Sequence, residues 1–321
     1  MNRWFLIFAL TANCVAQSEL ELLGTASARV ELRLVDEDHN ALQNTECSVG
    51  FLLPGKTWDS YKFAPKRGAS DRSGRFLAEG RTINTLGVGS HPKGYYISSR
   101  NIYLSNQEGG KWLPFPHVET LILKKVIKPV AMYAVAKWQI VLPGRNGEFG
   151  FDLERREWTA PHGTGVKSDL IFRQDVREGA IDSTATLRIS FSNRGDGLIP
   201  LYALHGVESE LKLPRTAPLE GYEPEHDITI AWSESRGLTP PVKPVLGYLY
   251  RIRTELHESG QVKRGWYGKI DGEFDWDPRN VQTTQVTLTY YLNPDGTPNL
   301  EFDRKQNLFG ELPIENSVLQ P

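Results

Sequence analysis

Apolar and polar residues alternate one by one through most of the chain beyond its first residues. In one such segment, Val30, Leu32 and Leu34 share one face, and charged residues occupy the other. The same alternation recurs in residues 185–191, 227–232, 248–256 and 286–292. Because successive side chains of a strand point to opposite faces, the pattern predicts half-buried β-strands. A polar second face favours antiparallel sheets, since parallel sheets are covered on both sides.

Turn signals separate the predicted strands, and no long stretch keeps the period of a helix. Turn-forming residues gather at 71–74, 193–197 and 293–296, and the chain holds 29 glycines and 20 prolines. We therefore expect an all-β protein with two antiparallel β-sandwich-like domains. The boundary is placed at Lys128, after a predicted strand that ends near Val126. The predicted domains are residues 17–128 and 129–321.

The first residues have the form of a secretory signal peptide. One positive charge, Arg3, precedes an apolar run over residues 4–10, which is much shorter than the roughly 20 residues of a membrane-spanning helix. The small residues ending at Ala16 predict cleavage there, so residues 1–16 form the signal peptide. Cys14 follows Asn13 instead of the small residue of a bacterial lipoprotein signal, which argues against a lipid anchor. We expect a secreted or periplasmic protein.

Composition restricts the partners of the processed chain. It retains one cysteine, Cys47, so its stability depends on hydrophobic cores and not on intramolecular disulfides. The full chain has a net charge of −2 and scattered lysines and arginines, which argues against a nucleic-acid partner. No second apolar run is long enough to cross a membrane, so we expect no transmembrane segment after cleavage.

Three segments of the first half carry turn patterns. Residues 30–42 form a strand followed by a turn that begins at Asp36. Residues 71–76 read Asp-Arg-Ser-Gly-Arg-Phe, and residues 94–96 read Gly-Tyr-Tyr. In such turns the aspartate caps the turn through its carboxylate, glycine takes the positive-φ position, and phenylalanine enters the core.

Together these segments resemble the carboxypeptidase regulatory-like domain, a transthyretin-like β-sandwich, over about residues 28–125. His39 stands where the family usually has glycine, Ala41 stands where it has proline, and the insertion at residues 56–69 is longer than expected. The resemblance implies a non-catalytic module for folding support, surface display or docking, with no catalytic residues to carry over. The predicted fold of the second half rests on alternation alone.

The chain carries no motif for catalysis or for binding a metal or cofactor. None of the seven histidines lies within four residues of another, so no ligand pair stands in the sequence. Cys47 precedes an apolar run and is expected to be a buried, unreactive thiol. The Asn-Pro-Asp-Gly turn at residues 293–296 alternates oxygen-bearing side chains as calcium loops do, but the EF-hand spacing fails and a hairpin is predicted. We predict no catalytic residues, no metal site and no cofactor.

One acidic segment, residues 265–277, is the main candidate for polar chemistry. One face carries aromatic residues, an isoleucine and glycines, and the other carries Tyr267, Lys269, Asp271, Glu273, Asp275 and Asp277. Carboxylates two residues apart on a strand lie about 6.5–7 Å from each other, near the spacing of the acid and base of an inverting glycosidase. Because such pairs face each other across a cleft, a solvated acidic face is expected here, with a carbohydrate or cation contact as the alternative. A second alternative is that Asp271-Gly272 turns the chain into a hairpin.

The tryptophans divide into two groups. Four are in phase with aliphatic neighbours and are expected in cores: Trp138, Trp232, Trp266 and Trp276. Three lie near turns or prolines and are the candidates for an exposed ligand-binding platform: Trp58, Trp112 and Trp158.

These observations predict an exported, non-catalytic β-sandwich protein with a binding or envelope-structural role. Its expected partner is a cell-envelope protein or a glycan. The alternative function is a carbohydrate-active or other hydrolase with its carboxylates in the second domain. A concave cleft with two facing carboxylates in that domain favours the hydrolase, and an exposed candidate tryptophan beside a groove favours glycan binding.

Overall fold

The computed structural model describes residues 24–55, 57, 60–179, 181–202, 209–233, 235, 237–239, 245–279 and 284–321. The chain forms two compact units. The first unit comprises Met1–Ile127 and Gly206–Lys212, and the second comprises Lys128–His205 and Leu213–Pro321. The predicted signal peptide with Cys14, and the candidate Trp58, lie outside the described residues.

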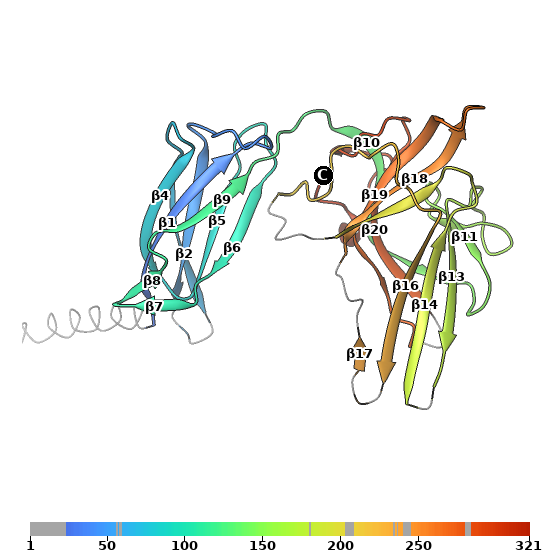
Figure 1. Ribbon diagram of the computed structural model, residues 1–321, viewed down its shortest axis with the longest axis horizontal. Helices are drawn as coiled ribbons and strands as arrows, with labels where there is room; N and C mark the ends of the chain where they lie inside the picture. The colour runs from blue at the N-terminus through green and yellow to red at the C-terminus, as the bar shows by residue number, and fades with distance from the viewer. Residues whose placement is uncertain are drawn as a thin grey trace, which may run out of the picture. The chain divides into compact units, whose positions relative to one another are not determined.

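The first unit is a sandwich of two sheets (Figure 1). Its strands are β1 (Ala26–Val35), β2 (Glu46–Pro54), β3 (Tyr61–Ala69), β4 (Arg75–Thr82), β5 (Thr85–Ser90), β6 (Ser98–Tyr103), β7 (Asn106–Glu108), β8 (Lys111–Leu113) and β9 (His117–Ile122). One sheet, called here the β1 sheet, has the order β4-β1-β8-β7, and β9 also pairs with β1. The other, the β2 sheet, has the order β3-β2-β5-β6.

The core of the first unit lies between these two sheets. Val30, Leu32 and Leu34 are fully buried, as the alternation predicts, and belong to one cluster with Phe51 of β2. Cys47 lies in the same cluster, and burial raises the pKa of its thiol to about 11. The thiol is therefore protonated at neutral pH, in agreement with the prediction of an unreactive cysteine.

Strand β9 is an exception to the predicted antiparallel pairing. It runs parallel to β1, from Val30 opposite His117 to Val35 opposite Ile122. Parallel neighbours need a crossover connection instead of a hairpin, and between β1 and β9 the chain passes through the β2 sheet. Most other strand pairs of the unit are antiparallel.

Two aspartate-capped turns of the first unit have the same construction. Asp36 Oδ1 accepts hydrogen bonds from the backbone N–H groups of Asp38 and Asn40, at 3.0 and 2.8 Å. Asp71 Oδ1 accepts from the backbone of Ser73 and Arg75, at 2.8 and 3.0 Å. The positive-φ position is held by His39 (62°) in the first turn and by Gly74 (76°) in the second. A histidine therefore adopts the conformation that glycine adopts more easily.

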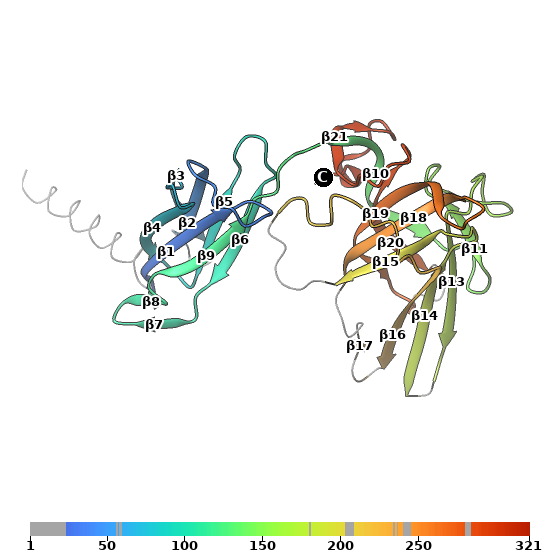
Figure 2. The same ribbon diagram turned by 45° about the horizontal axis from the view of Figure 1, so that its top comes forward.

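The second unit is a larger sandwich (Figures 1 and 2). Its strands are β10 (Val130–Val141), β11 (Phe149–Asp152), β12 (Glu157–Trp158), β13 (Leu170–Arg177), β14 (Asp182–Ser190), β15 (Gly197–Tyr202), β16 (Glu225–Ser233), β17 (Gly237–Thr239), β18 (Val245–Leu256), β19 (Val262–Trp276), β20 (Gln285–Asn293) and β21 (Phe302–Asn307), followed by the 3₁₀ turn η1 (Ile314–Asn316). The β14 sheet has the order β12-β11-β13-β14-β16-β17. The β19 sheet has the order β15-β18-β19-β20-β10-β21.

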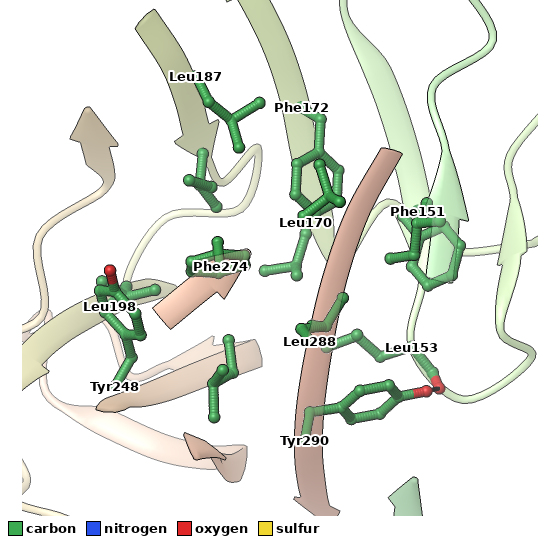
Figure 3. Close-up of a cluster of buried hydrophobic side chains, with 14 of the residues drawn as sticks. Phe151, Leu153, Leu170, Phe172, Leu187, Leu198, Tyr248, Phe274, Leu288 and Tyr290 are labelled. Atoms are coloured by element: carbon green, nitrogen blue, oxygen red, sulfur yellow. Dashed lines mark hydrogen bonds between the residues drawn. The ribbon is translucent and has the colours of Figure 1, made fainter. Parts of the chain in front are cut away.

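The main core of this unit lies between the β14 and β19 sheets (Figure 3). Phe151 and Phe172 of the β14 sheet belong to one buried cluster with Tyr248, Phe274 and Tyr290 of the β19 sheet. The rings of Tyr248 and Phe274 lie side by side, with centroids 5.0 Å apart. The prediction of an all-β, sandwich-type fold is confirmed.

The β19 sheet is buried on its second face as well, which corrects the prediction of a solvated face. Leu249 and Tyr267 pack there with Ala217 and Leu300, and Tyr291 packs with Phe302. Lys269, predicted on an exposed acidic face, is 1% exposed and its Nζ donates to the carbonyl of Leu300 at 2.7 Å. Only the far end of β19, from Glu273 onward, alternates between exposed and buried residues.

Two turn predictions in this unit need revision. Strand β19 does not fold into a hairpin at Asp271-Gly272, because Gly272 (φ 86°) lies instead at a register shift within one continuous strand. The turn after Asn293 forms, with Asp295 Oδ1 accepting from the backbone of Thr297 at 2.7 Å. It joins no hairpin, since the next strand, β21, pairs with β10 and not with β20.

The one helical element among the described residues is η1, and none of those residues forms a helix long and apolar enough to cross a membrane.

Candidate binding groove

A groove opens in the second unit where the last strands of the β14 sheet meet the β19 sheet. It has a volume of about 540 Å³. Its apolar lining comes from both sheets: Ile228 and Ile230 of β16, Leu238 of β17, Val245 and Tyr248 of β18, and Phe274 and Trp276 of β19. Ile228 and Phe274 also belong to the main core, so the groove is an open continuation of that core.

The rim of the groove is acidic. Asp227, Glu273, Asp275 and Asp277 line it, and no lysine or arginine among the described residues does. Two of these carboxylates have cationic neighbours outside the lining: Arg188 binds Asp227 through two 2.8 Å hydrogen bonds, and Arg279 binds Asp277. These hydrogen bonds hold the pKa of both carboxyls below the usual range. The unbalanced charge of the rim therefore comes from Glu273 and Asp275.

Two nitrogen-bearing side chains complete the lining. Trp276 is 4% exposed, and its indole Nε1 has no hydrogen-bond acceptor among the described residues. A buried donor without a partner is costly, and an oxygen acceptor of a ligand would satisfy this one after the side chains that cover it move. His226 lies edge-on against Tyr248, with ring centroids 5.3 Å apart, and burial lowers its pKa. At neutral pH its imidazole is uncharged and can donate one hydrogen bond and accept another.

Two carboxylates of the groove are unsuited to act as the acid of a glycosidase. Carboxylates do line both walls, with Asp227 on β16 and Glu273, Asp275 and Asp277 at the end of β19. A glycosidase needs one carboxyl with a raised pKa to protonate the leaving group. The pKa values of Asp227 and Asp277 are shifted in the opposite direction, so neither carboxyl holds a proton at neutral pH.

A second set of carboxylates surrounds Arg253 at the opposite end of β18. Its guanidinium binds both oxygens of Asp169, at 2.8 and 2.9 Å, and also Glu154 and Asp152, and it lies 4.2 Å from the ring centre of Trp266. Burial raises the pKa of Asp169 to about 6. Asp152 also accepts four backbone N–H groups, from residues 154, 155, 166 and 167. The cluster is satisfied internally and ties the two sheets together.

Neither described tryptophan candidate forms an exposed platform. Trp112 is 8% exposed, and its Nε1 donates to the carbonyl of Thr82, so the ring serves the core of the first unit. Trp158 packs edge-on against Phe151 and Phe172 and donates to the carbonyl of Val141. Trp112 was expected at the surface, but sheet packing buries it. Trp158 is half-buried.

Exposed aromatic rings gather in the first unit, on the outer face of the β2 sheet. Tyr61 and Phe63 of β3 and Tyr103 of β6 are 61%, 58% and 75% exposed. The ring of Phe63 lies directly over Gly50, where a Cβ would come within 2.0 Å of it, and reaches toward Gly87. Glycines thus form a flat floor on which the ring lies with one face open to solvent.

Sequence patterns located half of the groove. The acidic segment at residues 265–277 contributes Glu273, Asp275 and Asp277, whereas His226 and its neighbours on β16 were not predicted. Histidine spacing could not single out His226, because its neighbours in space come from strands distant in sequence. Among the described residues, no group of three or more His, Cys, Asp and Glu side chains is arranged to hold a metal ion.

No protein-family model matches the chain, and no curated protein matches it. Three solved structures are similar to it at low TM-scores. A streptococcal ancillary pilin has 10% identity and a TM-score of 0.23, and the match covers 82% of this chain but only 58% of the pilin. The shaft pilin SpaA from Lactobacillus rhamnosus GG has 12% identity and a TM-score of 0.21, over 54% of this chain and 90% of that one.

The third structure is a Bacteroides uniformis protein described as a candidate carbohydrate-binding protein. It has 11% identity and a TM-score of 0.20, over 82% of this chain and 95% of that one. At TM-scores this low, the likenesses carry no argument about function.

Proposed function

We propose that this is an exported, non-catalytic binding protein of the cell envelope, and that the groove of the second unit holds its partner. The observation that carries the proposal is the combination of an apolar lining, a rim whose described residues include four carboxylates and no lysine or arginine, and an indole donor without an acceptor in that part of the chain. Surface grooves with a few directed polar groups are the usual form of a binding site.

The lining favours a segment of an envelope protein over a sugar. Sugars stack on exposed aromatic faces, whereas Tyr248, Phe274 and Trp276 are at most 4% exposed and, of the groove's described aromatic residues, Tyr202 alone is open, at 47%. An apolar side chain of a peptide fits the space beside Ile230 and Leu238. A neighbouring lysine or arginine would meet Glu273 and Asp275, and a peptide carbonyl would accept from Trp276 Nε1.

The test is a peptide array probed with the processed chain, residues 17–321. Peptides with a large apolar residue next to a basic one should be enriched. The double variant Glu273→Gln/Asp275→Asn should weaken binding about tenfold, which corresponds to about 1.4 kcal/mol. A matched control, Glu148→Gln/Asp175→Asn, removes two carboxylates that do not line the groove and should leave binding unchanged. Equal weakening by both double variants rules out the groove.

A single substitution addresses the indole donor. Trp276→Phe keeps an aromatic ring but removes the N–H group, and one hydrogen bond contributes about 1 kcal/mol. We expect roughly fivefold weaker peptide binding with a folded protein by circular dichroism. Unchanged affinity would mean that the indole does not meet the ligand.

The hydrolase remains the enzymatic alternative, and the same protein serves to test it. Polysaccharide and generic ester substrates should show no turnover above that of a heat-denatured sample. Turnover that disappears in Glu273→Gln/Asp275→Asn would replace the binding proposal with an enzymatic one.

A glycan is the second candidate partner, and the outer face of the β2 sheet supports it. Tyr61, Phe63 and Tyr103 present open rings on a flat surface, which suits stacking of sugar rings. A glycan array with the processed chain should give hits that Phe63→Ser abolishes and that Trp276→Phe leaves intact. Hits that survive Phe63→Ser exclude this surface.

For the first unit we propose the carboxypeptidase regulatory-like family, in a docking or folding-support role. The two matching aspartate-capped turns at Asp36 and Asp71 support this assignment. Export follows from the signal peptide, and N-terminal sequencing of the protein after expression in a secreting host should begin at Gln17. A retained Met1, or a lipid on Cys14, contradicts cleavage after Ala16.

A further inference from the structure

A second, larger cleft lies in the same unit, between the start of β19 and the loops beside β15. Its volume is about 850 Å³. The cationic side chains that line it are Arg194, Arg251, Lys263 and Arg264, together with His257, and Glu220 is the one carboxylate among its described lining residues. In a chain with a net charge of −2, this is a local concentration of positive charge.

Arg251 is the buried cation of this cleft. Its residue is only 6% exposed, and its guanidinium lies 4.4 Å from the ring centre of Tyr222. Three hydrogen bonds fix its orientation: Nε and Nη2 donate to the carbonyl of Gly195 at 3.0 and 2.7 Å, and Nη1 donates to the carbonyl of Leu219 at 2.7 Å. The side chain is therefore held in place before any ligand arrives.

The charge of Arg251 has no counter-ion among the described residues. Its three hydrogen bonds go to two backbone carbonyls, and no described carboxylate forms an ion pair with it. A guanidinium carries five N–H groups, so one on Nη1 and one on Nη2 remain unused. Burying an unpaired charge is costly, and an anion in the cleft would remove that cost.

The other cations lie around the same cleft at its exposed rim. Lys263 is 3.8 Å from Glu255, an exposed pair that solvent screens. Arg194 and Arg264 form no ion pair within the described part of the chain. Arginine forks match the geometry of phosphate and carboxylate groups.

We propose that this cleft binds an oxyanion, a phosphate or a carboxylate group, with Arg251 as the fixed anchor and Lys263 and Arg264 as the rim contacts. The site is separate from the groove at the other end of the sandwich and takes the opposite charge. A polymer that carries such groups would place one of them on the two unused N–H groups of Arg251.

The test is calorimetric titration of the processed chain at low ionic strength, with inorganic phosphate and, separately, with galacturonate. We expect saturable binding of at least one probe at a single site, weakened by added salt. The two titrations distinguish a phosphate ligand from a carboxylate ligand. Absence of saturable binding of both probes at millimolar concentrations overturns the proposal.

Variants locate the bound anion. Lys263→Gln/Arg264→Gln should weaken binding at least fivefold, and Arg173→Gln/Arg188→Gln, which removes two arginines outside the cleft, should not. Arg251→Gln should abolish binding, and its fold is checked by circular dichroism. If that variant does not fold, the rim variant decides the matter, because equal weakening by both double variants would show a general charge effect and refute the site.

Discussion

Arg251 and Arg253 stand two residues apart on β18 but have opposite electrostatic surroundings. Arg253 contacts three carboxylates, from Asp152, Glu154 and Asp169. Arg251 contacts no described carboxylate: its guanidinium donates to backbone carbonyls and lies over the ring of Tyr222. The difference begins in the backbone, because Arg253 has φ 54° at a register shift that interrupts the alternation of β18. Its side chain thereby reaches the carboxylates of the β14 sheet.

The comparison distinguishes a charge that is neutralised within the protein, at Arg253, from one that has no described counter-ion, at Arg251. Burial alone would lower the pKa of Arg253, but hydrogen bonds and charge from Asp169 and Glu154 raise it above its usual value. All of its partners belong to the protein, so the cluster joins the two sheets. Arg251 is oriented equally well, and the proposed oxyanion would be its counter-ion.

The largest expected effect comes from removing Arg253. Arg253→Met leaves Asp152 and Asp169 buried without a cation, and breaking a buried ion pair in this way costs about 3–5 kcal/mol. Chemical denaturation should show that loss in the free energy of unfolding. The free energy of unfolding of Arg253→Lys should lie between those of Arg253→Met and the wild type, because an ammonium keeps the charge but cannot replace the two-point contact with Asp169. A loss below about 1 kcal/mol would remove the structural role of the cluster.

The pH dependence of stability is the next largest effect. Since burial raises the pKa of Asp169 from 3.8 to about 6, the folded chain binds this proton more tightly than the unfolded chain. The stabilisation from this proton is complete below pH 3.8 and is lost as the pH rises through 6, and it amounts to roughly 3 kcal/mol. Asp169→Asn should lack this component when unfolding free energies are compared at pH 4 and pH 7. Parallel pH curves for the two proteins would contradict the burial argument.

Removing Arg251 should cost less than removing Arg253. Arg251→Met leaves two carbonyls without donors but strands no carboxylate, so we expect a loss of about 1–2 kcal/mol in denaturant unfolding. A cost equal to that of Arg253→Met would mean that the two arginines have the same role and would break the comparison.

The smallest effect is expected for an exposed arginine. Arg188 forms a two-point contact with Asp227, yet solvent screens such pairs. Arg188→Ala should leave the thermal midpoint within the measurement error. A clear drop in the midpoint would show that distance alone, without burial, decides which pairs stabilise this fold.

The strands could be predicted because alternation is a local property of the sequence. The burial of Val30, Leu32 and Leu34 could be predicted from the residues next to them in the sequence. The burial of Lys269 and Arg251 could not be predicted, since the residues that cover this face, such as Leu300 and Leu219, come from other parts of the chain. The family resemblance of the first unit stays a prediction.

Only one wall of the candidate groove could be recognised from the sequence, for the same reason. Glu273 and Asp275 attracted attention as charges on one strand, but the opposite wall depends on which strand of the other sheet packs there. Trp112 is buried despite its flanking turns, because turns indicate where a chain bends and not which face of it is covered. The ring of Phe63 lies flat and exposed because Gly50, on a neighbouring strand, leaves room beneath it. A short sequence pattern cannot show this, because the two residues come together only in the folded sheet.

Residues 209–212 belong to the first unit although most of the sequence around them belongs to the second. Ser209 bridges to Ser98, Glu210 donates its backbone N–H to the carbonyl of Ile97, and Lys124 donates to the carbonyl of Leu211. Synthesis therefore cannot complete the first unit when its ninth strand emerges. The first unit lacks one of its segments until residue 212 has been synthesised. Its folding is therefore completed only after a large part of the second unit has been made.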